Sequence, residues 1–203
     1  MTDRVGQQLG SYRLVRLLGQ GGQAAVYLGQ HQHLRNYAAI KVLRAELAEK
    51  DRDQFLAEGR MLARLEHPQI VRIRDLVVEQ GTPFLVMDYA AGGTLRQKHP
   101  SGTCLALDTV VRYVKQVTSA LQYAHNQHVI HCDIKPGNML LGNQHEVLLS
   151  DFGIALFAPS PEQLSTQEMA GTLPYMAPEQ LRGKPCFASD QYAFLGSRGF
   201  RNG

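Results

Sequence analysis

The sequence has no long hydrophobic run. No stretch of apolar residues reaches the ~18 residues that a membrane-spanning helix needs, and residues 1–8, Met-Thr-Asp-Arg-Val-Gly-Gln-Gln, lack the apolar centre of a secretory signal. Cysteine is scarce as well: Cys104, Cys132 and Cys186 are scattered and odd in number, which argues against a disulfide framework. We therefore expect a chain without a membrane segment that resides in the reducing cytoplasm.

Charge of one sign is also lacking. The 21 Lys and Arg residues against 18 Asp and Glu residues give a net charge of +3, and no basic tract typical of nucleic-acid-binding tails occurs, so we expect no nucleic-acid partner. Charged residues make up 19% and hydrophobic residues 44% of the chain, which excludes a disordered polymer. A chain of 203 residues without internal repeats predicts one compact domain, with room for two lobes.

The first ~90 residues consist mostly of short β-type runs. Strands are predicted over residues 12–18, 24–28, 37–43, 70–78 and 84–87. Residues 50–65 change period: Phe55, Met61 and Leu65 recur at broadly helical spacing with charged residues between them, which predicts a helix that ends before His67-Pro68.

Beyond a glycine-containing segment at residues 90–94, the best candidate for a hinge, the pattern is mainly helical. Apolar residues from Val110 to Ala124 recur at i, i+4, i+7, i+11 and i+14, which predicts one face of a long helix with Asp108 as its N-cap. Short strands at 139–141 and 147–149 flank a Gly142-Asn143 turn, and residues 159–166 are predicted to form an exposed loop. This order predicts an α+β protein with two lobes and a ligand cleft between them.

Two features of the first half suggest phosphate binding. The pattern Gly19-x-Gly21-x-x-Ala24-x-Val26 lies between two strands, where glycines let backbone N–H groups approach a triphosphate, although a simple hairpin turn explains it equally well. Lys41 lies within an apolar strand, where a buried ammonium needs an anionic partner. Glu58 on the following helix is the candidate, and the alternative is an edge-strand lysine with a solvated glutamate.

The densest polar cluster lies at residues 131–138, His-Cys-Asp-Ile-Lys-Pro-Gly-Asn. Asp133 could accept the proton of an attacking hydroxyl. Thirteen residues after Asn138 comes Asp151, at the start of Asp-Phe-Gly, and these two residues could give Mg²⁺ two oxygen ligands. The segment 171–179, Gly-Thr-Leu-Pro-Tyr-Met-Ala-Pro-Glu, and the pair Ser189-Asp190 follow.

In this order the motifs resemble those of the eukaryotic-type serine/threonine protein kinases of bacteria, from about Tyr12 to Tyr192. The resemblance implies a two-lobed α+β kinase fold, with a small β-rich N-lobe containing one main helix and a mainly helical C-lobe. It places an extension at residues 1–11 and a kinase domain at 12–203, with an N-lobe at about 12–89 and a C-lobe at about 94–192. It also implies ATP and Mg²⁺ as cofactors and transfer of the γ-phosphate to Ser/Thr hydroxyls of protein substrates in signalling. It implies nothing about oligomeric state.

The resemblance also assigns roles to residues. Asp133 would be the catalytic base, and Lys135 would contact the transferred phosphate. Lys41, paired with Glu58, would hold the other phosphates, and Asn138 and Asp151 would bind Mg²⁺. The nucleotide would contact Leu18, Gly19, Gly21, Gly22, Ala24, Val26, Ala39, Lys41, Met87, Asp88, Ala90 and Leu140. Lys135 and Thr172 are typical of kinases for Ser/Thr rather than Tyr.

Two departures from the family pattern lie near the chemistry. Ala24 replaces the third glycine, which we expect to be tolerated. Cys132 stands where many members have an arginine that pairs with a phosphate on the activation loop. We hypothesise that activity does not depend on phosphorylation of the loop hydroxyls Ser160, Ser165 and Thr166.

The third departure is in residues 194–203, which carry three glycines and two arginines and do not suit a buried helix. In the family a long apolar helix continues after the residue at Asp190, which braces the catalytic loop. We therefore expect an aberrant tail at 194–203, a C-lobe without its last helices and an apolar patch on the helix at 110–124. Glu179 would lack its usual arginine partner, and the chain would have marginal stability and weak or absent activity.

These residues also suggest two alternative functions and one possible metal site. A kinase-fold enzyme for small molecules is disfavoured by residues 171–179, which build a protein-substrate platform in the family. A truncated nucleotide-binding pseudokinase or interaction module remains the alternative from another class. His125, His128 and His131 span the end of a helix and a loop, and we interpret them as structural rather than as metal ligands.

Overall fold

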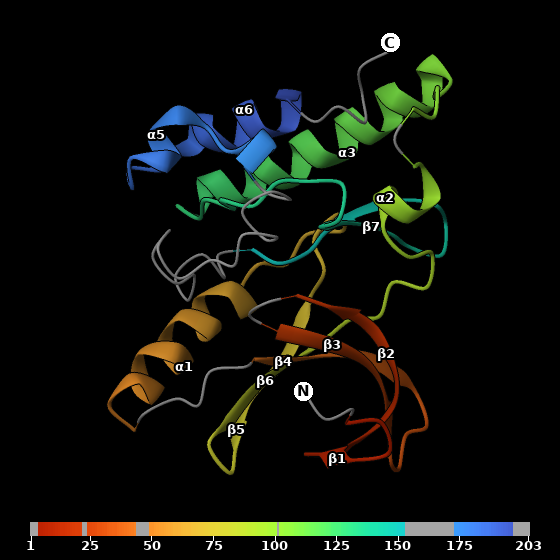
Figure 1. The fold of residues 1–203 in the computed structure, drawn as a ribbon, viewed down its shortest axis with the longest axis vertical. Coiled ribbons are helices and arrows are strands. Elements are labelled where there is room, and N and C mark those ends of the chain that lie inside the picture. Colours follow the sequence, from red (N-terminus) through yellow and green to blue (C-terminus); the bar gives the residue numbers. More distant parts are fainter. Residues whose placement is uncertain (1–3, 22–23, 44–48, 101, 153–172, 197–203) are drawn as a thin grey trace. The chain divides into compact units, whose positions relative to one another are not determined.

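The chain divides into two compact units (Figure 1). One contains Met1–Glu66 and Arg72–Tyr89, and the other contains His67–Val71 and Ala90–Gly203. The computed structural model describes residues 4–21, 24–43, 49–100, 102–152 and 173–196, without the side chains of residues 49–52, 54 and 58.

The first unit is built on a six-stranded antiparallel sheet with the strand order β1-β2-β3-β4-β6-β5. The strands are β1 (Gln8–Leu9), β2 (Tyr12–Gln20), β3 (Ala24–His31), β4 (Tyr37–Leu43), β5 (Ile73–Glu79) and β6 (Thr82–Met87). Its central strand, β4, is buried at every position after Tyr37. This burial on both faces explains why β4 does not alternate between apolar and polar residues, with Lys41 as its one charged side chain.

Strand β1 is a difference from the expected extension at residues 1–11. Gln8 pairs with Arg13 and Leu9 pairs with Tyr12, so the chain folds back onto β2 before the predicted domain start. Leu9 is only 8% exposed and joins the core of the sheet. A two-residue strand is too short to show an alternating pattern, and its pairing depends on the neighbouring strand.

Helix α1 (Glu49–Ala63) matches the predicted helix and packs against β5. Phe55 and Leu62 are 1% and 5% exposed, whereas Met61, which shared their predicted face, is 42% exposed. Gly59 marks the closest approach, because a Cβ added there would lie 2.2 Å from Cδ2 of Leu76. A larger residue at this position would require the side chain of Leu76 to move.

The second unit is mainly helical. It contains α2 (Leu95–Lys98), α3 (Leu107–Asn126), β7 (Met139–Leu141), β8 (Val147–Leu149), the 3₁₀ turn η3 (Leu173–Tyr175), α5 (Pro178–Leu181) and α6 (Phe187–Gly196). Helices α3 and α6 lie side by side (Figure 1), joined by a hydrogen bond from His125 to Asp190. None of the helices in the described ranges is long and apolar enough to cross a membrane.

Helix α3 corrects two expectations. Its N-cap is Ala106 and not Asp108, which lies in the first turn, where a negative charge favours the helix dipole. Val117, Ala120 and Ala124 have no exposed surface, so the expected apolar patch does not form along the middle of the helix. Exposure of large apolar side chains on α3 is confined to Leu107 and Val111 near its start.

Residues 69–71 also differ from the prediction, which assigned residues 70–78 to one strand. The N–H of Val71 donates to the carbonyl of Leu149 at 2.8 Å, and the N–H of Leu149 donates to the carbonyl of Gln69 at 2.8 Å. This segment therefore adds to β8 in the second unit, and β5 begins only at Ile73. Sequence periodicity cannot reveal a change of partner within one apolar run.

Helix α6 corrects the lower boundary of the expected tail. It continues through Gly196 and buries Phe194, which is 5% exposed, although we expected no buried helix from this residue onward. Tertiary packing therefore extends the helix despite the poor local propensity of its last residue. The rest of the expected tail, residues 197–203, lies outside the described residues, as does the predicted loop at 159–166.

Candidate functional site

The polar segment 131–138 is anchored by a single buried carboxylate. Asp190 on α6 is 1% exposed. One of its oxygens accepts hydrogen bonds from the N–H of His131 and from Nε2 of His125, both at 2.8 Å, and the other accepts from the N–H of Cys132 at 2.9 Å. Two consecutive backbone N–H groups thus bind one carboxylate, which fixes the start of the segment against α6.

The ring of His131 extends this anchoring to the next segment. The ring is fully buried, and its Nε2 lies 2.9 Å from the carbonyl oxygen of Ser150. Because a carbonyl only accepts, Nε2 carries the proton and Nδ1 is left as an acceptor. Nδ1 accepts from the N–H of Asp133 at 3.3 Å. The ring also packs against Phe152, with 4.5 Å between centroids.

The carboxylate of Asp133 is held by only one of its two oxygens. Oδ2 lies 2.8 Å from Nδ2 of Asn138 and 2.8 Å from Nζ of Lys135. Oδ1 is buried and has no hydrogen-bond partner among the described residues. A buried oxygen without a partner is rare in folded proteins, so this atom is suited to accept a hydrogen bond from a ligand or a water molecule.

Asn138 links this carboxylate to the Asp-Phe-Gly segment. Its Nδ2 donates to both the carbonyl and Oδ2 of Asp133 at 2.8 Å. The carbonyl of Asn138 accepts from the N–H of Ser150 at 2.9 Å and from Oγ of Ser150 at 3.0 Å. Asp151 follows directly, with a left-handed φ of 65°. Since Nδ2 is committed to Asp133, Oδ1 is the atom that Asn138 can offer to a cation.

Cys132 lies beside the carboxylate but is not a reactive thiol. Burial, with smaller contributions from the negative charges of Asp190 and Asp133, raises the pKa of Cys132 to about 11. The protonated thiol is a poor nucleophile at neutral pH. Cys132 therefore contributes its backbone to the site, in a left-handed conformation with φ 63°.

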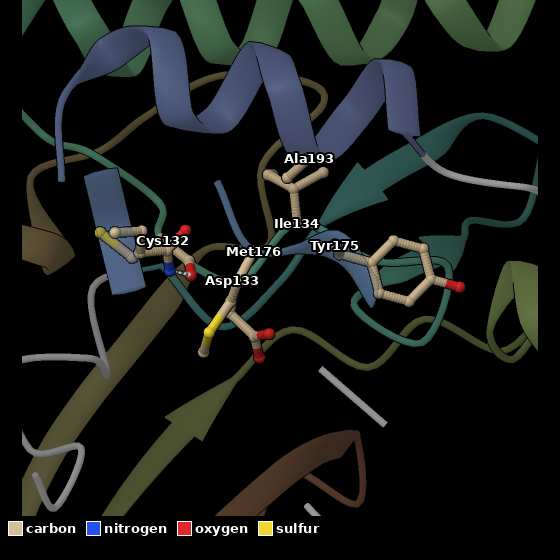
Figure 2. Close-up of a pocket in the computed structure, with 7 residues that line it drawn as sticks. Cys132, Asp133, Ile134, Tyr175, Met176 and Ala193 are labelled. Atoms are coloured by element: carbon tan, nitrogen blue, oxygen red, sulfur yellow. Dashed lines mark hydrogen bonds between the residues drawn. The ribbon is translucent and has the colours of Figure 1, made fainter. Parts of the chain in front are cut away.

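A shallow pocket opens beside Asp133 (Figure 2). Besides Asp133 it is lined by Cys132, Ile134, Tyr175, Met176, Gln180 and Ala193. Tyr175 and Met176 belong to the segment 171–179, and Gln180 follows it on α5. The structure thus brings the end of this segment next to the predicted base.

Sequence reasoning missed two side chains that hold the site. Gln180 donates from Nε2 to the carbonyl of Cys132, and His125 binds Asp190 as described above. The ring of His131 binds the carbonyl of Ser150, whereas the ring of His125 binds Asp190, so the two rings have different partners. Their spacing along the sequence carried no signal for contacts made with α6.

Glu179 has a partner other than the family's arginine. Oγ of Ser189 donates to Oε1 of Glu179 at 2.6 Å, and this hydrogen bond is the first cause of a lowered pKa of Glu179. Ser189 is 1% exposed and also accepts at 3.1 Å from the N–H of Cys186. The hydroxyl of Ser189 on α6 is therefore the group that binds Glu179 on α5.

The first unit holds Lys41 and the glycine segment. Lys41 is 7% exposed, opposite Val26 on β3 and Leu85 on β6. Gly19, the last residue but one of β2, pairs with Val26, and the N–H of Gly21 donates to the carbonyl of Ala24 at 2.9 Å. A Cβ added at Gly19 would meet no atom within 4 Å, so the packing of this unit does not itself require glycine there.

The predicted nucleotide residues are divided between the two units. Leu18, Gly19, Gly21, Ala24, Val26, Ala39, Lys41, Met87 and Asp88 belong to the first unit, and Ala90 and Leu140 belong to the second. Gly22 and the side chain of Glu58 lie outside the described residues, so the predicted Lys41–Glu58 pair stays a prediction. The residues that the structure does bring together are Asp133, Lys135 and Asn138.

Comparison with known proteins identifies the family. The protein kinase domain family matches residues 12–194. The chain is 41% identical over 187 residues to the serine/threonine-protein kinase Pkn1 of Myxococcus xanthus, covering 89% of this chain and 27% of that protein. It is 36% identical over 200 residues to PknF of Mycobacterium tuberculosis, covering 93% of this chain and 42% of that protein. The chain thus spans well under half the length of these relatives.

A solved structure gives the same result for the fold. The kinase domain of Mycobacterium tuberculosis PknI, crystallised as a cysteine-to-alanine mutant, aligns with a TM-score of 0.75 and 31% identity, over 98% of this chain and 79% of that one. The α+β architecture with a β-rich N-lobe and a partial helical C-lobe, expected from the sequence, is confirmed.

Proposed function

Since the chain belongs to the protein kinase family, we propose that it is a serine/threonine protein kinase domain that transfers the γ-phosphate of ATP to Ser/Thr hydroxyls of protein substrates in the bacterial cytoplasm. One observation carries the proposal: Asp133 has one oxygen fixed by Asn138 and Lys135 and the other buried without a partner among the described residues.

Asp133 supplies the base in this mechanism. With Oδ2 occupied at 2.8 Å by two donors, Oδ1 is the atom left to accept a hydrogen bond from a substrate hydroxyl. That hydrogen bond would orient the hydroxyl oxygen toward the γ-phosphorus. The carboxylate would take up the hydroxyl proton while the new P–O bond forms and the bond to the bridging oxygen breaks, with ADP as the leaving group. Tyr175, Met176 and Gln180 line the same shallow pocket as Asp133, and we place the acceptor segment next to them.

Lys135 complements this carboxylate. Its Nζ lies 2.8 Å from Oδ2 of Asp133 and its side chain is 26% exposed, so the ammonium can bind an anionic group while it stays next to the base. Positive charge at this place stabilises the negative charge of the phosphoryl oxygens during transfer. The same ammonium also fixes Asp133, which keeps the two groups in one geometry.

The donor set of the second unit fits Mg²⁺. The amide oxygen of Asn138 and the carboxylate of Asp151 are hard oxygen ligands of the kind that Mg²⁺ takes together with phosphate and water. When bound, Mg²⁺ supplies charge neutralisation for the phosphates. Asn138 is held for this task because its Nδ2 is committed twice to Asp133.

The first unit fits the phosphates of ATP. Lys41 lies 7% exposed on β4, and a lysine ammonium can bind the anionic oxygens of phosphates. The open space at Gly19 leaves room for a ligand to approach the backbone between β2 and β3. These features support Lys41 and the glycine segment as phosphate contacts.

The test is a phosphotransfer assay with Mg-ATP labelled on the γ-phosphate and a generic protein acceptor, followed by identification of the labelled amino acid. We expect phosphoserine and phosphothreonine. Label in free small molecules but not in protein would favour the small-molecule alternative. Stabilisation of the fold by Mg-ATP without any transfer would favour the nucleotide-binding pseudokinase, and in either case the proposal would be wrong.

A further inference from the structure

The peptide unit between Cys132 and Asp133 is held at both ends by side chains. Its carbonyl accepts a hydrogen bond from Nε2 of Gln180 on α5. Its N–H donates to Nδ1 of His131 at 3.3 Å, a long contact. This peptide unit carries the Asp133 side chain, so its orientation determines where the carboxylate lies.

The orientation is not one that the backbone would keep by itself. Cys132 has a φ of 63°, in the left-handed region that residues with a Cβ avoid. Such conformations persist at functional sites only where surrounding contacts over-determine them. The N–H of Cys132 is held by Asp190 at 2.9 Å, and Gln180 holds the carbonyl on the other side of this residue.

Gln180 itself is fixed relative to the loop by a closed circuit of hydrogen bonds. The N–H of Cys132 binds Asp190, and the neighbouring Ser189 donates to Glu179 at 2.6 Å. Glu179 precedes Gln180 on α5, and Gln180 returns to the carbonyl of Cys132. Both backbone groups of Cys132 are thus bound by two helices that are themselves linked, and the circuit joins the pocket to the base.

We propose that Gln180 is a positioning residue for Asp133: by holding the Cys132 carbonyl it sets the orientation of the peptide unit that carries the base. The proposal rests on the proposed function, because it assigns Gln180 an effect on phosphate transfer. The amide of Gln180 binds the Cys132 carbonyl and not the Mg²⁺ candidates Asn138 and Asp151, so its loss should lower kcat without changing the KM for ATP. Small misplacement of a reacting group costs rate steeply, and we expect a decrease of about tenfold or more.

The test compares Gln180→Met, which keeps the length but removes the donor, with Gln180→Glu, which offers only acceptor oxygens at neutral pH. The matched control is Gln122→Met on α3, where the amide donates to the exposed Asn126. Steady-state kinetics with Mg-ATP gives kcat and KM. A second measurement does not need activity: the rate of iodoacetamide labelling of Cys132, mapped by mass spectrometry relative to the exposed Cys104.

Both Gln180 variants should label Cys132 several-fold faster than the parent chain and should lose kcat at constant KM, while Gln122→Met changes neither. An unchanged labelling rate in the folded variants would refute the proposal that Gln180 holds the Cys132 carbonyl in place. Faster labelling with unchanged kcat would overturn the effect on the base. Loss of cooperative unfolding in both variants would show a purely structural residue and would also overturn it. If the Gln180 variants are labelled faster but the parent chain transfers no phosphate, the contact of Gln180 with Cys132 is supported and the proposed function is refuted instead.

Discussion

Replacing Asp190 by alanine should destabilise the second unit more than any exposed substitution. Asp190 is 1% exposed and accepts from the N–H groups of His131 and Cys132 at 2.8 and 2.9 Å, besides its contact with His125. In Asp190→Ala both N–H groups lose their partner without reaching water. A buried polar group left unpaired costs about 1–3 kcal/mol, so the two together reduce the free energy of unfolding by about 4 kcal/mol.

This loss is large because small domains have only about 5–15 kcal/mol of stability in total. Urea unfolding followed by circular dichroism measures it, since the chain has no tryptophan for fluorescence. With a urea m-value of about 2 kcal/mol/M, the midpoint falls by about 2 M. The exposed Asp108→Ala, in the first turn of α3, is the control and should cost about 0.5 kcal/mol. A loss below about 1 kcal/mol for Asp190→Ala would refute the reasoning, because a buried unpaired N–H group costs at least that much.

Three further predictions concern packing, pH and regulation. In Gly92→Ala the added Cβ would lie 2.7 Å from Cβ and the carbonyl oxygen of Leu141, and urea unfolding should show a loss of about 1–3 kcal/mol, whereas Gly19→Ala, in open space, should change stability by less than about 0.5 kcal/mol. Burial raises the pKa of Cys132 from 9.0 to about 11, so the unfolded state loses this proton at a lower pH than the folded state does. The free energy of unfolding should therefore fall as the pH rises between these values. Urea unfolding at several pH values should show a smaller fall for Cys132→Ala, and an equal fall would contradict the raised pKa. Activity should survive the simultaneous replacement of Ser160, Ser165 and Thr166 by alanine, because we expect phosphate transfer not to depend on phosphorylation of these residues. Loss of most phosphate transfer in this variant would contradict that expectation.

The sequence predicted those elements whose side chains follow one local rule. Strand β4 and strands β7 and β8 were placed with the bounds they have, because each is a short apolar run between turn residues. Helix α3 was found from the spacing of Val110 to Ala124, but its start was misplaced by two residues because Ala106, not a polar residue, is its N-cap. Capping residues are a preference and not a requirement, so packing can override them.

Features that depend on long-range partners were not predictable in this way. Leu9 pairs with Tyr12 in a two-residue strand, and Val71 joins β8 through Leu149, far along the chain. The side chain of Gln180 binds a carbonyl 48 residues earlier. Nothing in the local pattern around these residues distinguishes them from ordinary surface or strand positions.

The candidate site was predicted residue by residue from its motifs, but its electrostatics needed coordinates. The motif placed Asp133, Lys135 and Asn138 in one loop. Only the structure reveals that Lys135 and Asn138 bind the same oxygen of Asp133 and leave the other without a partner among the described residues. That asymmetry follows from the backbone path of the loop, which no sequence spacing determines.

The most direct test of the account is to separate nucleotide binding from phosphate transfer in Asp133→Asn. Binding is measured as the increase in unfolding free energy with Mg-ATP, which reaches about 2.7 kcal/mol at a hundredfold excess over Kd, and transfer is measured with a protein acceptor. The account predicts that Asp133→Asn keeps the stabilisation by Mg-ATP and loses transfer by about 10²–10⁴-fold, the usual contribution of a general base. Equal transfer by Asp133→Asn and the parent chain, or no transfer by either, would contradict it.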